Sequence, residues 1–96
     1  MPQVRVIAQL TTKPGSEEII REALAKLATA TQSHRGCAEF KLYESAAAPG
    51  TFVTVETWAS QDDHDSHMQT EDIAVAIAAS EGHIVGDITI HPLRPV

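Results

Sequence analysis

The sequence predicts an α+β fold, because segments with the two-residue period of strands alternate with segments that have the periodicity of amphipathic helices. Their order is strand, helix, strand, strand, helix, strand. This β-α-β-β-α-β order is typical of the split βαβ, or ferredoxin-like, arrangement, in which a four-stranded antiparallel sheet carries helices on one face. A chain of 96 residues suits a single domain, which we place over residues 1–96.

The first strand and the first helix have regular patterns. Residues 4–10 alternate, with apolar side chains at the even positions and Arg5, Ile7 and Gln9 at the odd positions. Proline and glycine in residues 13–15 end this strand. Ser16 is the predicted N-cap of a helix over residues 17–31, whose apolar residues recur at helical spacing.

The next two strands form a predicted hairpin. Residues 37–44 alternate, and the turn signals of residues 46–50 separate them from residues 51–58. The third strand is rich in β-branched and aromatic residues, which favour a pleated sheet. Its two faces are both substantially apolar, so the sheet needs cover on both sides. Too little chain remains for a third layer, and we therefore expect a homodimer.

Helical and strand signals alternate once more toward the C-terminus. Ser60 is the predicted N-cap of a helix over residues 61–69, and residues 71–80 continue as a helix rich in alanine. Residues 87–91 alternate again and form the last predicted strand, which Pro92 stops.

Composition excludes several classes of function. The chain has 13 acidic and 7 scattered basic residues, a net charge of −6, so we expect no nucleic-acid partner. Cys37 is the single cysteine and allows no intrachain disulfide, which is typical of a reducing compartment. We see no signal peptide and no apolar stretch of about 18 residues, and we expect a cytoplasmic protein without a membrane partner.

Two histidines are the first candidates for chemistry. His64 and His67 are three residues apart on a predicted helix and share a face. A metal would need further ligands, for which Asp63 and Asp72 are distant candidates, so we expect no metal. The simpler interpretation is a pair of exposed or half-buried helix histidines. As a general base, His67 has an unperturbed pKa of about 6.5, which suits proton transfer near neutrality.

Other side chains could line a pocket for a small aromatic ligand. Trp58 is either core or the wall of such a pocket. Glu56 is costly to bury alone, so it faces solvent, pairs with a cation such as Arg5, or lines a polar cavity. Tyr43 could bond a ligand oxygen or make a cross-strand contact. Cys37 is expected to be a small buried residue, since no base can be assigned beside it.

Several short motifs follow one another along the chain. They are Lys13-Pro14-Gly15-x-Glu17-Glu18, Gly36-Cys37, Phe40-x-Leu42-Tyr43, Pro49-Gly50-x-Phe52, Glu56-x-Trp58, His67 and Leu93-Arg94-Pro95-Val96. Together they resemble the antibiotic biosynthesis monooxygenase family. The resemblance spans essentially the whole chain and implies a ferredoxin-like subunit in a dimeric α/β barrel.

The resemblance also implies a chemistry. Some members oxidise phenols or quinols with molecular oxygen and without metal, flavin or haem, so no cofactor is expected. The carried-over catalytic residues are His67 and Trp58, with Glu56 and Phe40 as pocket neighbours; to the substrate-binding set we add Tyr43 and His64. Many members place a second histidine five residues after the first. That position holds Asp72 here, which weakens a two-histidine mechanism, and the helix that follows offers no axial ligand for haem.

Three functions remain open from the sequence. The first is a cofactor-independent monooxygenase acting on a small phenol, quinol or anthrone-like ring. The second is a non-catalytic module of the same fold that binds or sequesters a small aromatic or stress metabolite. The third is a sugar-phosphate isomerase, which would need a cationic clamp from Arg5, Arg21, Arg35 or Arg94.

Overall fold

The computed structural model describes residues 3–96, so the first two residues of the predicted domain lie outside the described residues. The observed elements are β1 (Val4–Thr12), α1 (Glu17–Thr31), β2 (Cys37–Glu44), β3 (Thr51–Trp58), α2 (Gln61–Met68), α3 (Glu71–Ser80) and β4 (Ile84–Leu93). This order confirms the predicted βαββαβ arrangement, with the second helical region divided into α2 and α3.

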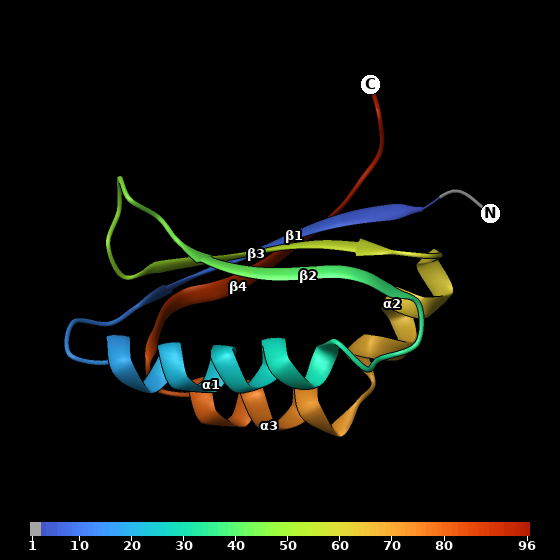
Figure 1. Ribbon diagram of the computed structural model, residues 1–96. Helices are drawn as coiled ribbons and strands as arrows, with labels where there is room; N and C mark the ends of the chain where they lie inside the picture. Colours follow the sequence, from blue (N-terminus) through green and yellow to red (C-terminus); the bar gives the residue numbers. More distant parts are fainter. Residues whose placement is uncertain (1–2) are drawn as a thin grey trace.

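The four strands form one antiparallel sheet in the order β2-β3-β1-β4. Helices α1 and α3 lie side by side on one face of this sheet, and α2 lies at the end where β3 leaves it (Figure 1). No described element covers the opposite face, which we call the open face. The fold class predicted from the sequence is therefore confirmed for the single subunit.

Two strands are longer than the alternation predicts. β1 continues past residue 10 to Thr12, whose N–H and hydroxyl both donate to the carbonyl of Gly50. β4 begins at Ile84 and passes through Pro92, so the prediction that Pro92 stops it was wrong. β4 is an edge strand, where a missing N–H can face solvent. Gly86, with φ of +67°, lies at the register shift between β1 and β4.

The alternation of β1 and β3 decides which side chains form the core. Val6 and Leu10 of β1, and Phe52 and Trp58 of β3, are buried beneath the helices. They pack into two clusters with apolar residues of the helices, among them Leu27 in one and Ile20 in the other. The odd positions of both strands face the open side of the sheet.

The two predicted serine caps differ in the structure. The Ser60 hydroxyl accepts a hydrogen bond from the Asp63 N–H and caps α2, as predicted. Ser16 stands at the N-cap of α1, but its side chain makes no capping bond and lies 3.0 Å from Nδ1 of His83. The first turn of α1 still carries two acidic residues, which the helix dipole favours.

Gly36, in the loop between α1 and β2, should tolerate no side chain. Its φ is +76°, and an added Cβ would lie 2.3 Å from the carboxyl carbon of Asp63. We expect Gly36→Ala to lose about 1–3 kcal/mol of stability from backbone strain and a further ~1–3 kcal/mol from the clash.

Gly82→Ala is the matched control for this substitution. Gly82 has a similar φ of +79°, but an added Cβ would meet no atom within 4 Å. Thermal unfolding of both variants separates strain from clash, since about 1 kcal/mol shifts the Tm by roughly 4–8 °C in a domain of this size. Equal Tm values for the two variants would contradict the predicted clash.

Candidate functional site

A cavity of about 530 Å³ lies between the sheet and the helices. Its walls are mainly apolar side chains from β1, β2, β3, β4, α1 and α3, and its lining includes Ala8, Leu24, Phe40, Phe52, Ile73, Ile84 and Ile88. Polar groups line it in two regions. Thr54, Glu56, His64 and His67 belong to β3 and α2, whereas the other region includes Glu81 and Asp87 near the start of β4.

His64 and His67 lie on the inner face of α2, as their spacing predicts. They are only 4% and 3% exposed, so the simpler interpretation of exposed or half-buried helix histidines was wrong. The His67 ring centroid lies 4.5 Å from that of Trp58 and 5.7 Å from that of Phe40. These aromatic contacts hold the ring of His67 at the cavity wall.

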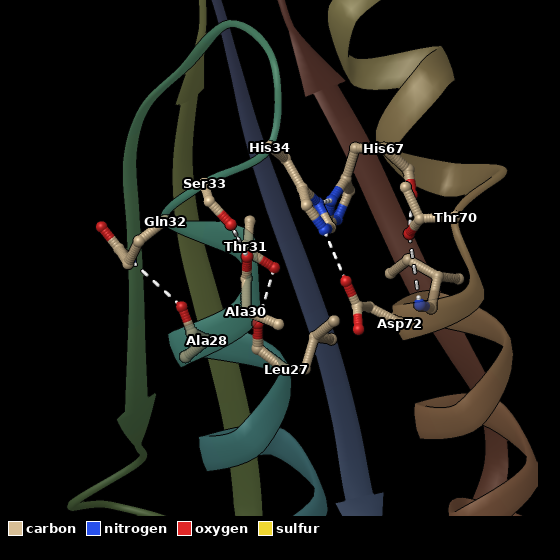
Figure 2. Close-up of polar contacts among 11 residues, drawn as sticks. Leu27, Ala28, Ala30, Thr31, Gln32, Ser33, His34, His67, Thr70 and Asp72 are labelled. Carbon is tan, nitrogen blue, oxygen red and sulfur yellow. Dashed lines mark hydrogen bonds and ion pairs between the residues drawn. The ribbon is translucent and has the colours of Figure 1, made fainter.

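A third histidine reaches this site from the loop between α1 and β2. Nδ1 of His34 lies 2.8 Å from Nδ1 of His67, and Nε2 of His34 lies 2.8 Å from Oδ2 of Asp72. Figure 2 shows the imidazoles of His34 and His67 next to each other, and a dashed line from His34 to the carboxylate of Asp72. Asp72 thus occupies the position where the resemblance expects a second histidine, while His34 supplies an imidazole from another element.

The pKa of His67 is lowered from its ordinary 6.5 to about 4. Burial is the largest cause, and the neighbouring His34 and His64 lower the pKa further. Asp72 acts in the opposite direction but is outweighed. His67 is therefore neutral near physiological pH and has a lone pair with which to accept a proton.

His64 carries an unsatisfied polar atom. Its Nε2 is buried and has no hydrogen-bond partner among residues 3–96, and its Nδ1 lies 3.5 Å from Nε2 of Gln61. Leaving a buried polar group unpaired costs about 1–3 kcal/mol. His64 contributes to the cavity lining, but this nitrogen has almost no accessible surface, so it lies behind the wall that a ligand would contact.

Glu56 lines the cavity and is 4% exposed. Its carboxylate accepts hydrogen bonds from the hydroxyl of Thr54 at 2.7 Å and from the indole N–H of Trp58 at 2.9 Å. None of the three sequence alternatives describes Glu56 fully: it lines a cavity, but that cavity is mainly apolar, and Thr54 and Trp58 satisfy the carboxylate. Arg5 pairs in register with Thr57 and so lies on the other face of the sheet.

The structure brings together some of the predicted site residues and separates others. Phe40, Glu56, His64 and His67 line the cavity, but Trp58 and Tyr43 do not. Trp58 is completely buried behind the two histidines, which it supports, instead of forming a wall for the ligand. Tyr43 is 51% exposed on the open face, because it lies three residues after Phe40 on the same strand.

The histidine cluster does not form a metal centre with the two proposed carboxylates. Asp63 accepts a hydrogen bond from Arg35, and Asp72 pairs with His34. Within residues 3–96, no group of three or more His, Cys, Asp or Glu side chains is arranged to hold a metal ion.

Burial, and then Glu56, raise the pKa of the Cys37 thiol, which keeps it protonated and a poor nucleophile.

The cavity also lacks a cationic clamp. Neither lysine nor arginine is among its described lining residues. Arg21 pairs with Glu18 and Glu44, and Arg35 pairs with Asp63. A sugar phosphate would therefore meet carboxylates instead of the positive charge that it needs, which argues against the isomerase.

The lowered pKa of His67 should make stability depend on pH. Between about pH 6.5 and pH 4 the unfolded chain binds a proton at this residue and the folded chain does not. The stabilising effect of the neutral ring is thus fully present above pH 6.5 and is lost as the pH falls toward 4. Urea unfolding should show a steeper loss of stability over this range in the wild type than in His67→Gln. Parallel curves would contradict the lowered pKa.

A family model and a solved structure indicate one family. The family model described as antibiotic biosynthesis monooxygenase matches residues 3–79. A solved structure of an antibiotic biosynthesis monooxygenase is 27% identical, with a TM-score of 0.90 over 97% of this chain and 98% of that one. A protein from Mycobacterium tuberculosis is 26% identical, with a TM-score of 0.90 over 99% and 96% of the two chains.

A third structure, from Pseudomonas aeruginosa, shares the fold at 21% identity, with a TM-score of 0.90 over 100% of this chain and 96% of that one. None of the curated proteins matches the sequence. In the part of the chain that the structure describes, no helix has the length and apolar character needed to cross a membrane.

Proposed function

The chain belongs to the antibiotic biosynthesis monooxygenase family, and from this premise we propose that it oxidises a small phenolic, quinol or anthrone-like aromatic with molecular oxygen. The observation that carries the proposal is the histidine-lined wall of the cavity. There the neutral His67 lines an otherwise mainly apolar chamber, with His64 beside it on the same face of α2.

The size and walls of the cavity suit such a substrate. A volume of about 530 Å³ lies within the range of roughly 300–1,000 Å³ that is typical of small-molecule sites. Apolar side chains such as Phe52 and Ile88 can contact a flat ring and exclude water. The few polar groups then fix the orientation of the ring by binding its oxygen atoms.

In the proposed reaction the protein handles the proton and the substrate supplies the electrons. Nε2 of His67 accepts the phenolic proton, and the ring of His64 contacts the substrate from the same face of α2. The resulting phenolate is electron-rich and reduces oxygen. One oxygen atom bonds to a ring carbon, and the other leaves as water with two hydrogens from the substrate. The substrate thus provides all four electrons.

Oxygen consumption tests this proposal. Purified protein is mixed with a panel of anthrones and naphthoquinols in an oxygen electrode, with heat-denatured protein as the blank for spontaneous oxidation. We expect uptake above the blank, one labelled atom in the product when ¹⁸O₂ is supplied, and no change after dialysis against a chelator. Uptake equal to the blank across the whole panel would sink the proposal.

A binding module without turnover is the second candidate. It is favoured by the pKa of about 4 for His67, since a group so hard to protonate is a weak base. A bound ligand raises stability by RT ln(1 + [L]/Kd). A quinol that raises the Tm but causes no oxygen uptake would support this second function over the first.

We further propose that two copies pair through the open face of the sheet. This face carries large apolar side chains in the isolated subunit, including Tyr43 at 51%, Val85 at 54% and Leu93 at 44% exposure. Cross-strand pairing places Tyr43 opposite Val53 and Leu93 opposite Arg5 on this face. A second copy would cover these side chains, and a stable interface buries more than about 1,200 Å² in total.

A further inference from the structure

The hydrogen bonds around His34 decide which imidazole nitrogens carry hydrogen. An ionised carboxylate only accepts, so Nε2 of His34 carries the hydrogen in its 2.8 Å contact with Asp72. When the ring of His34 is uncharged, its Nδ1 then has a lone pair and no hydrogen. The 2.8 Å contact between the two Nδ1 atoms therefore needs its hydrogen on His67.

We propose that Asp72 and His34 are positioning residues that hold His67 in the tautomer with hydrogen on Nδ1. When Nε2 of His67 accepts a proton from the substrate, His34 receives the hydrogen from Nδ1 and stores it. The tautomer of His67 is a property of the protein without substrate, whereas proton storage on His34 rests on the proposed function. Nε2 of His67 makes no hydrogen bond with any residue in 3–96 and keeps its lone pair for a hydroxyl group in the cavity.

The proton transfer can be followed atom by atom. A substrate hydroxyl gives its proton to Nε2 of His67, and the hydrogen on Nδ1 of His67 passes to Nδ1 of His34. His34 is then an imidazolium whose Nε2–H is still donated to Asp72. The substrate oxygen carries the negative charge, and the reverse transfers return the proton when the oxygenated product needs it.

The contact between His34 and Asp72 places a carboxylate where it can stabilise a positive charge on His34. The titratable groups that face His67 are His34 from the loop, His64 from α2 and Asp72 from α3. Burial lowers the pKa of His67 to about 4, so a proton is unfavourable on that ring. His34 instead contacts the carboxylate directly, and a charge-assisted hydrogen bond is stronger than a neutral one.

The packing of the helices explains how these residues, which are far apart in the sequence, come into contact. His34 follows the C-terminal end of α1, and Asp72 lies in the first turn of α3. Helices α1 and α3 pack side by side on the sheet (Figure 1). The packing of the two helices therefore brings Asp72 against His34, and α2 brings His67 to the same place (Figure 2).

Histidine nitrogen chemical shifts, measured by NMR on the ¹⁵N-labelled wild-type protein without substrate, test the tautomers. Near neutral pH we expect His67 to show hydrogen on Nδ1 and a lone pair on Nε2, and His34 to show the opposite. Asp72→Ala should release His34 and shift His67 toward a mixture of tautomers. The His67→Gln variant assigns the signals by their loss.

Asp62→Ala is the matched control, because it also removes one carboxylate. Asp62 is exposed on α2 and makes no side-chain hydrogen bond with any residue in 3–96. Its spectrum should keep the wild-type tautomers. A wild-type His67 with hydrogen on Nε2, or a tautomer unchanged in Asp72→Ala, would overturn the proposal. The wild-type measurement decides even if Asp72→Ala does not fold.

Kinetics separate this proposal from the proposed function. If a substrate is oxidised, Asp72→Ala should lower kcat by about tenfold or more with little change in KM, while Asp62→Ala should match the wild type. Removing the carboxylate that orients a catalytic histidine costs up to about 10⁴-fold in serine proteases. A wild-type kcat in Asp72→Ala would refute proton storage. Absence of oxidation in the wild type would refute the proposed function and leave the tautomer result to stand.

Discussion

Replacing His67 with glutamine should lower the rate of substrate oxidation by about 10²–10⁴-fold, the usual contribution of a general base. Glutamine keeps a similar size and can still form hydrogen bonds, but it cannot accept a proton near neutral pH. The loss should fall on kcat more than on KM, because the apolar walls that bind the ring remain. Oxygen uptake at saturating substrate measures it.

His83→Gln serves as the control for this loss. His83 lies near the start of β4, where its Nδ1 contacts the hydroxyl of Ser16, and it is absent from the cavity lining. Glutamine can keep that hydrogen bond, so the rate should stay within a few-fold of the wild type. A rate for His67→Gln that equals the rate for His83→Gln would show that His67 is not the base.

Placing a charge on the open face should have the second large effect. Val53 of β3 faces the open side of the sheet, between Gln9 of β1 and Tyr43 of β2 in the sheet register. In a dimer formed through this face, Val53→Asp buries a carboxylate that has no cation opposite it in the sheet register, and such a group costs about 2–5 kcal/mol. We expect the variant to dissociate or to unfold at concentrations where the wild type is dimeric.

Val75→Asp is the matched control on the other side of the molecule. Val75 is 60% exposed on α3, so the same substitution adds the same charge outside the proposed interface. Light scattering across a dilution series should show a dimer for the wild type and for Val75→Asp. A stable, folded wild-type monomer of 10.3 kDa at low micromolar concentration would contradict the dimer.

The fold was predictable because its signals are local. The alternation of β3 and the helical spacing of α1 each lie within a single segment, and the order of segments then selects the topology. The ends of β4 were not predictable in this way. Gly86 and Pro92 are strand breakers by local chemistry, but the edge position of β4 and its register shift against β1 accommodate both.

The positions of the candidate site residues were predictable only where the periodicity of a single helix or strand determines which face a side chain is on. The i, i+3 spacing placed His64 and His67 on one face, and the alternation of β2 places Phe40 and Tyr43 on opposite faces. His34 was missed because 33 residues separate it from His67 and only tertiary packing joins them. From the family resemblance, Asp72 stood out only because it replaces an expected second histidine. In the structure, Asp72 forms a hydrogen bond with a histidine from another element, His34.

The position of Trp58 has an optical consequence. It is the single tryptophan of the chain, and its ring lies 4.5 Å from His67 and 5.9 Å from His64. An imidazolium quenches the fluorescence of an adjacent indole more strongly than a neutral imidazole does. The intrinsic emission of the protein should therefore dim as His67 gains a proton in acid, and it should change when a ring enters the cavity. The native chain thus carries its own reporter of protonation and occupancy, with no label attached.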